Sequence, residues 1–448
     1  MSRIHEQHQN IFEFITIFRL SPPCPNKLCN AASSCKAYQT ASIEFKTNST
    51  FHIMGNSLEG FSETVEPPIV GGEPITAKET ERGHMYRISR DKYDAGGASD
   101  VKFAVSSMQG WRATMEDTHI LSPALSVTTK QGQKSPESNP KTTDLMDHAL
   151  FCVFDGHGGD FTPNYASKHF RRVLKDRPEW PKYVELSESE RKEVPGLKLL
   201  KEALSGAFLD IDMELKNLFK KRIEIHGGSQ SQHFSRGRNR LERQGHEDER
   251  DTNNTSRDMG RKHKIMVERS GSTAVMVLLT PHHIICCNAG DSRAILCRDG
   301  KALPLSFDHK PSNPTEMNRV KEAGGFVRYK RVDGDLAVSR GLGDFRFKLN
   351  EGVEYRNQKV SIVPDLIVCP RDHDKDEFIV IGCDGIWDVM KNQDCAEVVQ
   401  DFMDEGERDL GFLCENMLTT CLERQSKDNM TVCIVSLPAC SMNMMNKQ

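Results

Sequence analysis

Short apolar runs alternate with amphipathic segments between about residues 101 and 437, and this pattern predicts a mixed α and β domain. The apolar runs are bounded by Gly, Asp or Asn, as buried strands usually are, and lie at residues 149–154, 274–279, 284–288, 378–381 and 431–435. Apolar residues recur at three- and four-residue intervals in three longer segments, which we expect to be helices, at residues 162–174, 197–219 and 394–403.

Outside these segments the chain is polar and lacks a regular period. Residues 1–98 are rich in Ser, Thr, Asn, Pro and Glu, which predicts a disordered N-terminal tail. Residues 126–147 and 227–264 hold too few apolar side chains to offset the entropy of ordering, so we expect surface insertions of low complexity there. One α+β domain over residues 99–438 remains, followed by a short tail at 439–448.

Composition narrows the class of protein. The 448 residues carry a formal net charge of −4, with 37% apolar and 28% charged residues, which is typical of a soluble globular protein and argues against nucleic-acid binding. No apolar run reaches the roughly 20 residues of a membrane-spanning helix, and Glu13 and Arg19 interrupt the segment that most resembles a secretory signal. Most of the fourteen cysteines lie inside apolar runs, which favours reduced thiols in the cytoplasm or nucleus; Cys24, Cys29 and Cys35 are one ligand short of a structural zinc site.

Acidic residues stand at the ends of the predicted strands. Asp155, Asp384 and Asp291 each follow an apolar run, and Asp428 and Asn429 directly precede another. A carboxylate at the end of a strand has a rigid support, and several such carboxylates together are the oxygen ligands that Mg²⁺ and Mn²⁺ prefer. The pattern therefore predicts a divalent-metal site at one rim of the sheets.

Each of these motifs also has an ordinary structural explanation when taken alone. Asp-Gly after a strand is commonly a turn, and Gly158-Gly159 could be a helix approach or a contact for phosphate. His157 could be structural, and Arg112 could be a strand arginine with its charged end in water. Their occurrence together in one domain favours the functional interpretation.

Nine motifs in a fixed order resemble the signatures of the type 2C, metal-dependent serine/threonine protein phosphatases. The resemblance spans about residues 103–437 and rests on GWRATMED (110–117), FDGHGG (154–159), GSTA (271–274), NAGDSRA (288–294), DHKP (308–311), AGG (323–325), LAVSR (336–340), CDGIWD (383–388) and DNMT (428–431). One departure is Gly341, where the family pattern leads us to expect Ala.

The resemblance implies a fold and a set of metal ligands. The family fold is α+β, a four-layer αββα sandwich of two stacked antiparallel sheets flanked by helices. By similarity, Asp155 bridges two Mg²⁺ or Mn²⁺ ions and Asp384 and Asp428 complete the first. The remaining implied metal-site residues are the carbonyl of Gly156 and, through water, Glu116 at the second ion, Asp117 as an acceptor beside the ligands, and Asp291 and Asp388 at a weaker third ion. Asn429, in the same motif as Asp428, is a further site residue without an assigned ligand role.

The resemblance also implies how the reaction proceeds. Arg112 would bind the substrate phosphate, His157 would act as general acid, and residues 306–331 would form a variable flap beside the cleft. A hydroxide held by two metals would attack phosphoserine or phosphothreonine in protein substrates without a covalent intermediate. Cys286, Cys287 and Cys383 lie in predicted strands and not in a phosphate-cradling Cys-x₅-Arg loop, which disfavours a tyrosine-phosphatase mechanism.

Other interpretations stay open. The chain could be a catalytically silent scaffold that binds phosphoproteins, or the arginines of residues 227–264 could bind RNA or an acidic partner, although acidic residues dilute that charge. We expect a monomer in the cytoplasm or nucleus. Membrane association through N-myristoylation requires translation to start at Met54, and Glu59 stands where that motif has Ser or Thr.

Overall fold

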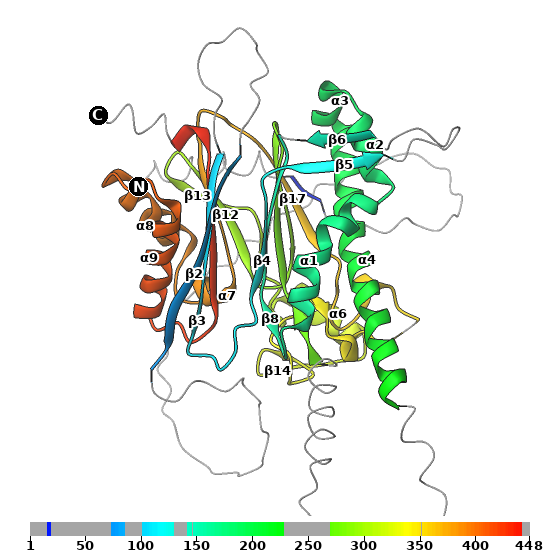
Figure 1. Ribbon diagram of the computed structural model, residues 1–448. Coiled ribbons are helices and arrows are strands. Elements are labelled where there is room, and N and C mark those ends of the chain that lie inside the picture. Colours follow the sequence, from blue (N-terminus) through cyan, green and yellow to red (C-terminus); the bar gives the residue numbers. More distant parts are fainter. Residues whose placement is uncertain are drawn as a thin grey trace, which may run out of the picture. The chain divides into compact units, whose positions relative to one another are not determined.

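Two six-stranded antiparallel sheets lie face to face with helices on both outer sides (Figure 1). The structure is a computed structural model and describes residues 16–18, 73–85, 101–129, 141–145, 147–227, 269–350 and 352–440. The first sheet contains, in spatial order, β1 (Thr16–Phe18), β17 (Asp365–Pro370), β11 (His283–Ala289), β10 (Ala274–Leu279), β7 (Ala149–Phe154) and β4 (Thr118–Ser122). The second contains β13 (Lys301–Pro304), β12 (Arg293–Arg298), β18 (Asp376–Gly382), β19 (Met430–Ser436), β3 (Val101–Gly110) and β2 (Ile75–Met85).

Helices cover the outer face of each sheet. The first sheet packs against α1 (Phe161–Asp176) and α4 (Val194–Gly227), with α2 (Glu179–Glu185) and α3 (Glu188–Lys192) between them in sequence. The second sheet packs against α8 (Asn392–Asp404) and α9 (Leu410–Glu423), and the short α7 (Asp384–Trp387) precedes them. The result is a four-layer αββα sandwich, which confirms the predicted fold class.

The strand β7 shows why the central strands are continuous apolar runs. Phe151 and Val153 face the second sheet, while Leu150, Cys152 and Phe154 face the helices. Both faces of the strand are buried, so every position is apolar rather than every second one. The same reason explains β10, whose residues are all buried.

Smaller elements lie around the sandwich. A three-stranded sheet has the order β16 (Leu342–Gly343), β9 (Gly271–Ser272) and β8 (Gly156–His157). The segment between β13 and β17 also holds α6 (Pro314–Glu322), the hairpin of β14 (Val327–Arg328) and β15 (Arg331–Val332), and the 3-10 helices η2 (Phe345–Phe347) and η3 (Tyr355–Asn357).

The predicted disordered tail is wrong for residues 75–85, which form β2. This strand pairs with β3 through its backbone, and its polar side chains bind α9: Arg82 to Asp409 at 2.7 Å and Thr80 to Glu415 at 2.8 Å. Because backbone pairing and surface polar contacts hold it, the strand leaves no apolar signature. Residues 16–18, also in the predicted tail, pair with β17. The candidate zinc cysteines and the segment around Met54 lie outside the described residues.

Two further boundaries need correction. The sequence predicts a low-complexity surface insertion at residues 126–147, but β5 (Leu125–Thr129) and β6 (Lys141–Leu145) pair there, and buried Leu125 and Leu145 join the core. The predicted C-terminal tail begins too early, because Ala439 and Cys440 are buried. The predicted insertion at 227–264 lies outside the described residues except for Gly227, which ends α4.

None of the helices in the described segments combines the length and the apolar character needed to cross a bilayer. The cysteines of these segments are unpaired and buried, as the sequence predicts.

Candidate metal centre

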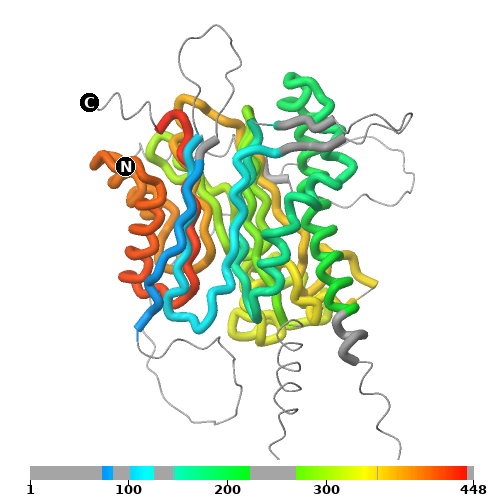
Figure 2. The backbone as a smooth tube through the Cα atoms, viewed as in Figure 1, coloured from blue at the N-terminus to red at the C-terminus, as the bar shows by residue number. Residues whose placement is uncertain are grey.

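The chain crosses between the two sheets at the same end of the sandwich where the aspartates lie. Figure 2 shows one crossing, in which β3 of the second sheet leads directly into β4 of the first. Asp155 lies between β7 and β8, Asp291 between β11 and β12, and Asp384 at the start of α7 after β18. Carboxylate oxygens of these three residues lie within 4.8 Å of one another. The two sheets thus both contribute acidic groups to one cluster.

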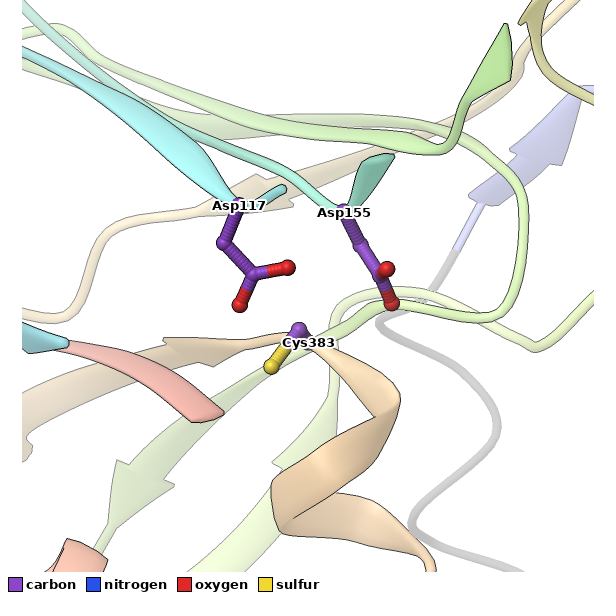
Figure 3. A group of neighbouring side chains, drawn as sticks. All are labelled: Asp117, Asp155 and Cys383. Atoms are coloured by element: carbon purple, nitrogen blue, oxygen red, sulfur yellow. The ribbon is translucent and has the colours of Figure 1, made fainter. Parts of the chain in front are cut away.

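A second group shares Asp155 with this cluster. The carboxyl groups of Asp117 and Asp155 and the thiol of Cys383 have atoms within 4.8 Å of one another (Figure 3). One oxygen of Asp117 accepts a hydrogen bond of 2.7 Å from Thr431 Oγ1, whereas its buried Oδ1 has no protein partner among the described residues. Burial, and then the charges of Asp117 and Asp155, raise the pKa of the Cys383 thiol well above its usual value, so it remains protonated and is a poor ligand.

The carboxyl groups of the cluster destabilise one another's charge. Burial, followed by the charge of Asp384, raises the pKa of Asp155 well above its usual value, and burial with Asp291 and Asp428 does the same to Asp384. Burial raises the pKa of Asp117 to about 7. The buried Oδ1 of Asp291 also has no partner in the described part of the chain. Crowded carboxylates with spare lone pairs fit hard divalent cations such as Mg²⁺ or Mn²⁺, which bind oxygen.

A cleft of about 150 Å³ opens over this cluster. Its walls include Glu116 and Asp428 as well as Arg112, whose Nη2 donates to Asp428 Oδ2 at 2.6 Å. The Glu116 carboxylate accepts hydrogen bonds from Thr114 Oγ1 at 2.9 Å and from Gly159 N at 3.1 Å. The cleft therefore combines acidic groups with two arginines, Arg112 and Arg331. The other N–H groups of Arg112 have no partner among the described residues.

Asn429 holds the loop that carries Arg112 and Glu116. Its side-chain amide donates to the carbonyls of Gln109 and Thr114, both at 2.9 Å, and its Oδ1 accepts from Glu116 N at 3.0 Å. Gly156 allows the two loops to approach closely, since a Cβ at this position would lie 2.4 Å from the carbonyl oxygen of Glu116. Asn429 is thus a structural support of the site.

His157 also lines the cleft, and it has a partner that the sequence did not indicate. Its Nε2 lies 2.7 Å from Oδ2 of Asp344, a carboxyl group that is fully buried. Burial alone would lower the pKa of His157, but the charge and hydrogen bond of Asp344 raise it above its usual value. The Asp344 carboxylate therefore stabilises the imidazolium form of His157.

The small sheet explains how two residues so distant in sequence meet. In its register, His157 of β8 lies opposite Gly271 of β9, and Gly271 lies opposite Gly343 of β16. A Cβ on Gly271 would lie 2.2 Å from Asp344 Oδ2 and 2.3 Å from His157 Nε2, so glycine leaves the space in which the pair meets.

The proposed third-metal pair is arranged differently from the main cluster. Asp291 is buried within the cluster, whereas the Asp388 side chain is 65% exposed and is not part of the cleft lining. Between them lies Lys310, whose Nζ is 2.8 Å from Asp291 and 3.6 Å from Asp388. The ammonium group supplies a positive charge at the place where the sequence led us to expect a third ion.

The segment expected to be a flap, residues 306–331, contains α6 and the start of the β14–β15 hairpin. Arg331 of this hairpin lines the cleft, as does Thr273 of the GSTA motif. The motifs indicate no individual role for Asp344, Lys310 or Arg331. The available signals were the position of Lys310 inside the DHKP motif, of Asp344 shortly after LAVSR, and of Arg331 at the end of the expected flap.

An αββα sandwich with a carboxylate-lined cleft at its rim is the arrangement that the motifs imply for a metal-dependent phosphatase. The family model "Protein phosphatase 2C" matches residues 101–233 and 213–430, and the chain belongs to this family of protein phosphatases, which are hydrolases.

Individual relatives agree with this assignment. Protein phosphatase 1B of Rattus norvegicus is 34% identical over 346 residues, which cover 77% of this chain and 73% of the relative. Protein phosphatase 2C homolog 2 of Schizosaccharomyces pombe is 34% identical over 355 residues, covering 77% and 76%. A solved structure of serine-threonine phosphatase 2C from Toxoplasma gondii has a TM-score of 0.54 and 21% identity over 80% of this chain and 99% of that one, which supports the fold.

Proposed function

We propose that the protein hydrolyses phosphoserine and phosphothreonine in protein substrates with two divalent cations, Mg²⁺ or Mn²⁺, in its cleft. The strongest support is the cluster of Asp155, Asp291 and Asp384, whose oxygens lie within 4.8 Å of one another. Among the described residues, Lys310 forms an ion pair with Asp291, and the other two carboxyl groups have no such partner. Divalent cations bound there would make a water molecule nucleophilic near neutral pH and offset the charge of the phosphate.

The metal ligands proposed for this chain follow the family pattern. Asp155 would contact both cations, Asp384 and Asp428 would complete the first, and the carbonyl of Gly156 and the side chain of Glu116 would serve the second. Asp117, Asn429 and the pair Asp291 and Asp388 would support the ligands or a weaker third cation. The five proposed ligands of the first two cations all line the same cleft: Asp155, Asp384, Asp428, Gly156 and Glu116.

Arg112 would bind the phosphate. The hydrogen bond from Arg112 to Asp428 uses one N–H of the guanidinium group. The remaining N–H groups of this planar group are available to donate to phosphate oxygens. Only about a quarter of the side chain is exposed, so such hydrogen bonds would form in a partly dehydrated place where they are stronger than in water.

His157 would protonate the leaving group. Serine and threonine leave as alkoxides, which need a proton as the P–O bond breaks. With Nε2 bonded to Asp344, Nδ1 is the nitrogen left to deliver this proton, and the buried carboxylate stabilises the positive charge that the ring carries before transfer. Asp344 is therefore proposed as a positioning residue for His157.

The metal requirement is tested by phosphate release from a phosphothreonine peptide. We expect turnover to stop in EDTA and to return with added Mn²⁺ or Mg²⁺, and Asp384→Asn to stay inactive while Asp374→Asn, at an exposed carboxylate before β18, behaves like wild type. Undiminished turnover after exhaustive chelation would contradict the proposal. Equal turnover of a phosphotyrosine peptide would contradict the proposed substrate class.

The role of His157 is tested with two leaving groups. Nitrophenyl phosphate releases a stable phenolate and needs little protonation, whereas a general acid contributes about 10²–10⁴-fold when the leaving group is an alkoxide. His157→Gln should therefore reduce peptide turnover far more than nitrophenyl phosphate turnover at saturating Mn²⁺. Equal losses on both substrates would mean that His157 only supports the loop of Asp155. A phosphoprotein-binding scaffold without activity would hydrolyse neither substrate in the wild-type form.

A further inference from the structure

A buried ion pair lies behind the His157–Asp344 pair. Lys348, just after η2, places its Nζ 2.9 and 3.0 Å from the two carboxylate oxygens of Asp212 on α4. The two side chains are only 3% and 2% exposed. Lys348 Nζ also donates to the carbonyl of Gly341 at 2.8 Å. The ammonium group thus has a partner for each of its three N–H donors.

The pair is attached to the backbone that leads into Asp344. Besides the contact of Lys348 with the Gly341 carbonyl, Asp212 Oδ1 accepts a hydrogen bond of 2.8 Å from Gly343 N. Gly341 and Gly343 flank Leu342 of β16, and Asp344 follows directly. The ion pair therefore fixes the backbone on both sides of Leu342, in the segment that brings Asp344 beside His157.

Asp344 depends on this backbone for its orientation. Its φ of 51° lies in the left-handed region, which is unfavourable for a residue other than glycine and requires support from its surroundings. Its Oδ2 contacts His157, while the buried Oδ1 has no hydrogen-bond partner in the described part of the chain. With so few contacts of its own, the carboxylate points at His157 mainly because the main chain places it there.

Stability alone is a poor explanation for an ion pair in this place. Removing two charges from water costs free energy that their attraction often fails to recover, and apolar pairs of similar volume are frequently as stable. Leucine and methionine could fill the space between α4 and the β16 segment. What an apolar pair lacks is the set of directed hydrogen bonds to Gly341 and Gly343.

We propose that Asp212 and Lys348 are positioning residues for proton delivery by His157. They fix the backbone of β16, and this backbone holds Asp344 in contact with His157. The inference rests on the proposed role of His157 as proton donor. Its consequence is specific: loss of the ion pair should impair reactions whose leaving group needs a proton and should spare those whose leaving group does not.

The test compares leaving groups in Lys348→Met and Asp212→Asn. At saturating Mn²⁺, we expect kcat for a phosphothreonine peptide to fall about 10- to 100-fold, the range in which small misplacements of catalytic groups act. The kcat for nitrophenyl phosphate should fall by less than about threefold, because little protonation is needed. The Mn²⁺ concentration for half-maximal activity should not change, since the ion pair contacts no proposed metal ligand.

Two further variants separate positioning from stability. Asp212→Leu combined with Lys348→Met leaves no unpaired buried charge, so it should fold even if the single variants do not, and it should show the same difference between substrates. Asp376→Asn breaks another buried ion pair, that of Asp376 with Arg298 at the opposite end of β18 from Asp384. It should lower the thermal midpoint without changing the ratio of the two kcat values.

The outcomes are distinct. Equal losses on both substrates in the double variant, or no loss on either, would overturn the inference while leaving His157→Gln, with its own difference between substrates, as support for the proposed function. If His157→Gln itself shows equal losses, the proposed proton donor fails and the inference fails with it. A difference between substrates in both His157→Gln and the double variant would support both.

Discussion

Glu316 on α6 provides a quantitative test of how the segment beside the cleft is held. Its carboxylate accepts hydrogen bonds from Arg319 Nη1 at 2.6 Å, Ser339 Oγ at 2.7 Å and Arg340 Nη2 at 2.8 Å. The side chain is 4% exposed, so solvent screens these contacts little. Burial alone would raise the pKa of Glu316, but Arg340 and Arg319 lower it from 4.5 to about 2.

This shift converts into a free energy of unfolding. A pKa lowered from 4.5 to about 2 corresponds to about 3 kcal/mol at 1.36 kcal/mol per pH unit. We therefore expect Glu316→Gln to reduce the free energy of unfolding at pH 7 by about 3 kcal/mol, in the range seen when one partner of a buried ion pair is removed. Urea unfolding followed by fluorescence measures the change.

The pH dependence gives the same test a sign. Because the folded-state pKa is lowered, the stabilisation is complete above about pH 4.5 and is lost as the pH falls toward 2. The difference in stability between wild type and Glu316→Gln should shrink over that interval. Glu322→Gln, at an exposed position of the same helix, is the control and should change stability little. A loss below about 1 kcal/mol at pH 7, or a difference that stays constant with pH, would refute the reasoning.

Two predictions concern the metal centre. Asp155→Asn should raise the thermal midpoint of chelator-treated protein, by about 2–4 °C per kcal/mol of relieved repulsion, and should remove most of the further rise that Mn²⁺ gives the wild type. Differential scanning calorimetry with and without Mn²⁺ checks both changes, and a variant as strongly stabilised by Mn²⁺ as the wild type would contradict the ligand assignment. Lys310→Met should lower the Kd of the weakest Mn²⁺ site roughly tenfold, or by ~1.4 kcal/mol in binding free energy, because it removes the competing ammonium group beside Asp291 and Asp388. Equilibrium dialysis measures this, with Lys310→Arg as the control that keeps the charge, and weaker binding would show that Lys310 supports the site instead.

The central strands and the main acidic cluster could be predicted because burial leaves a record in the sequence. The run at residues 149–154 is apolar throughout since helices cover one face of β7 and the second sheet covers the other, and its bounds match the strand. Asp155 and Asp384 then stand out as charges directly at the ends of apolar runs. That they converge follows from the family order of the motifs more than from the residues themselves.

The polar strands could not be predicted in the same way. β2, with the sequence ITAKETERGHM, is an edge strand held by backbone pairing and by surface contacts such as Arg82 with Asp409. Such contacts have no periodic signature, so the segment resembled the tail before it. β5 and β6 were not predicted either, although Leu125 at the start of β5 and Leu145 at the end of β6 join the core.

Contacts between residues far apart in the sequence could not be predicted either. Asp344 and His157 are 187 residues apart, and their contact depends on the register of β8, β9 and β16, which are two residues long. Close packing also explains Gly341, which stands where the family pattern has Ala. A Cβ at this position would lie 2.7 Å from the carbonyl oxygen of Ser272, so this backbone is more closely packed than alanine allows without a shift.

The placement of the acidic cluster couples metal binding to the contact between the two sheets. Asp155 and Asp291 follow strands of the first sheet, whereas Asp384 and Asp428 adjoin strands of the second. Without a cation, their mutual repulsion acts across the interface that the apolar core between the sheets holds closed. A bound cation would attract both sides, so its binding free energy would add to the stability of the sandwich, by about 2.7 kcal/mol at a concentration of 100 times Kd. The same carboxylates that make the cluster costly to fold are therefore the reason that the metal should stabilise the fold as well as serve the reaction.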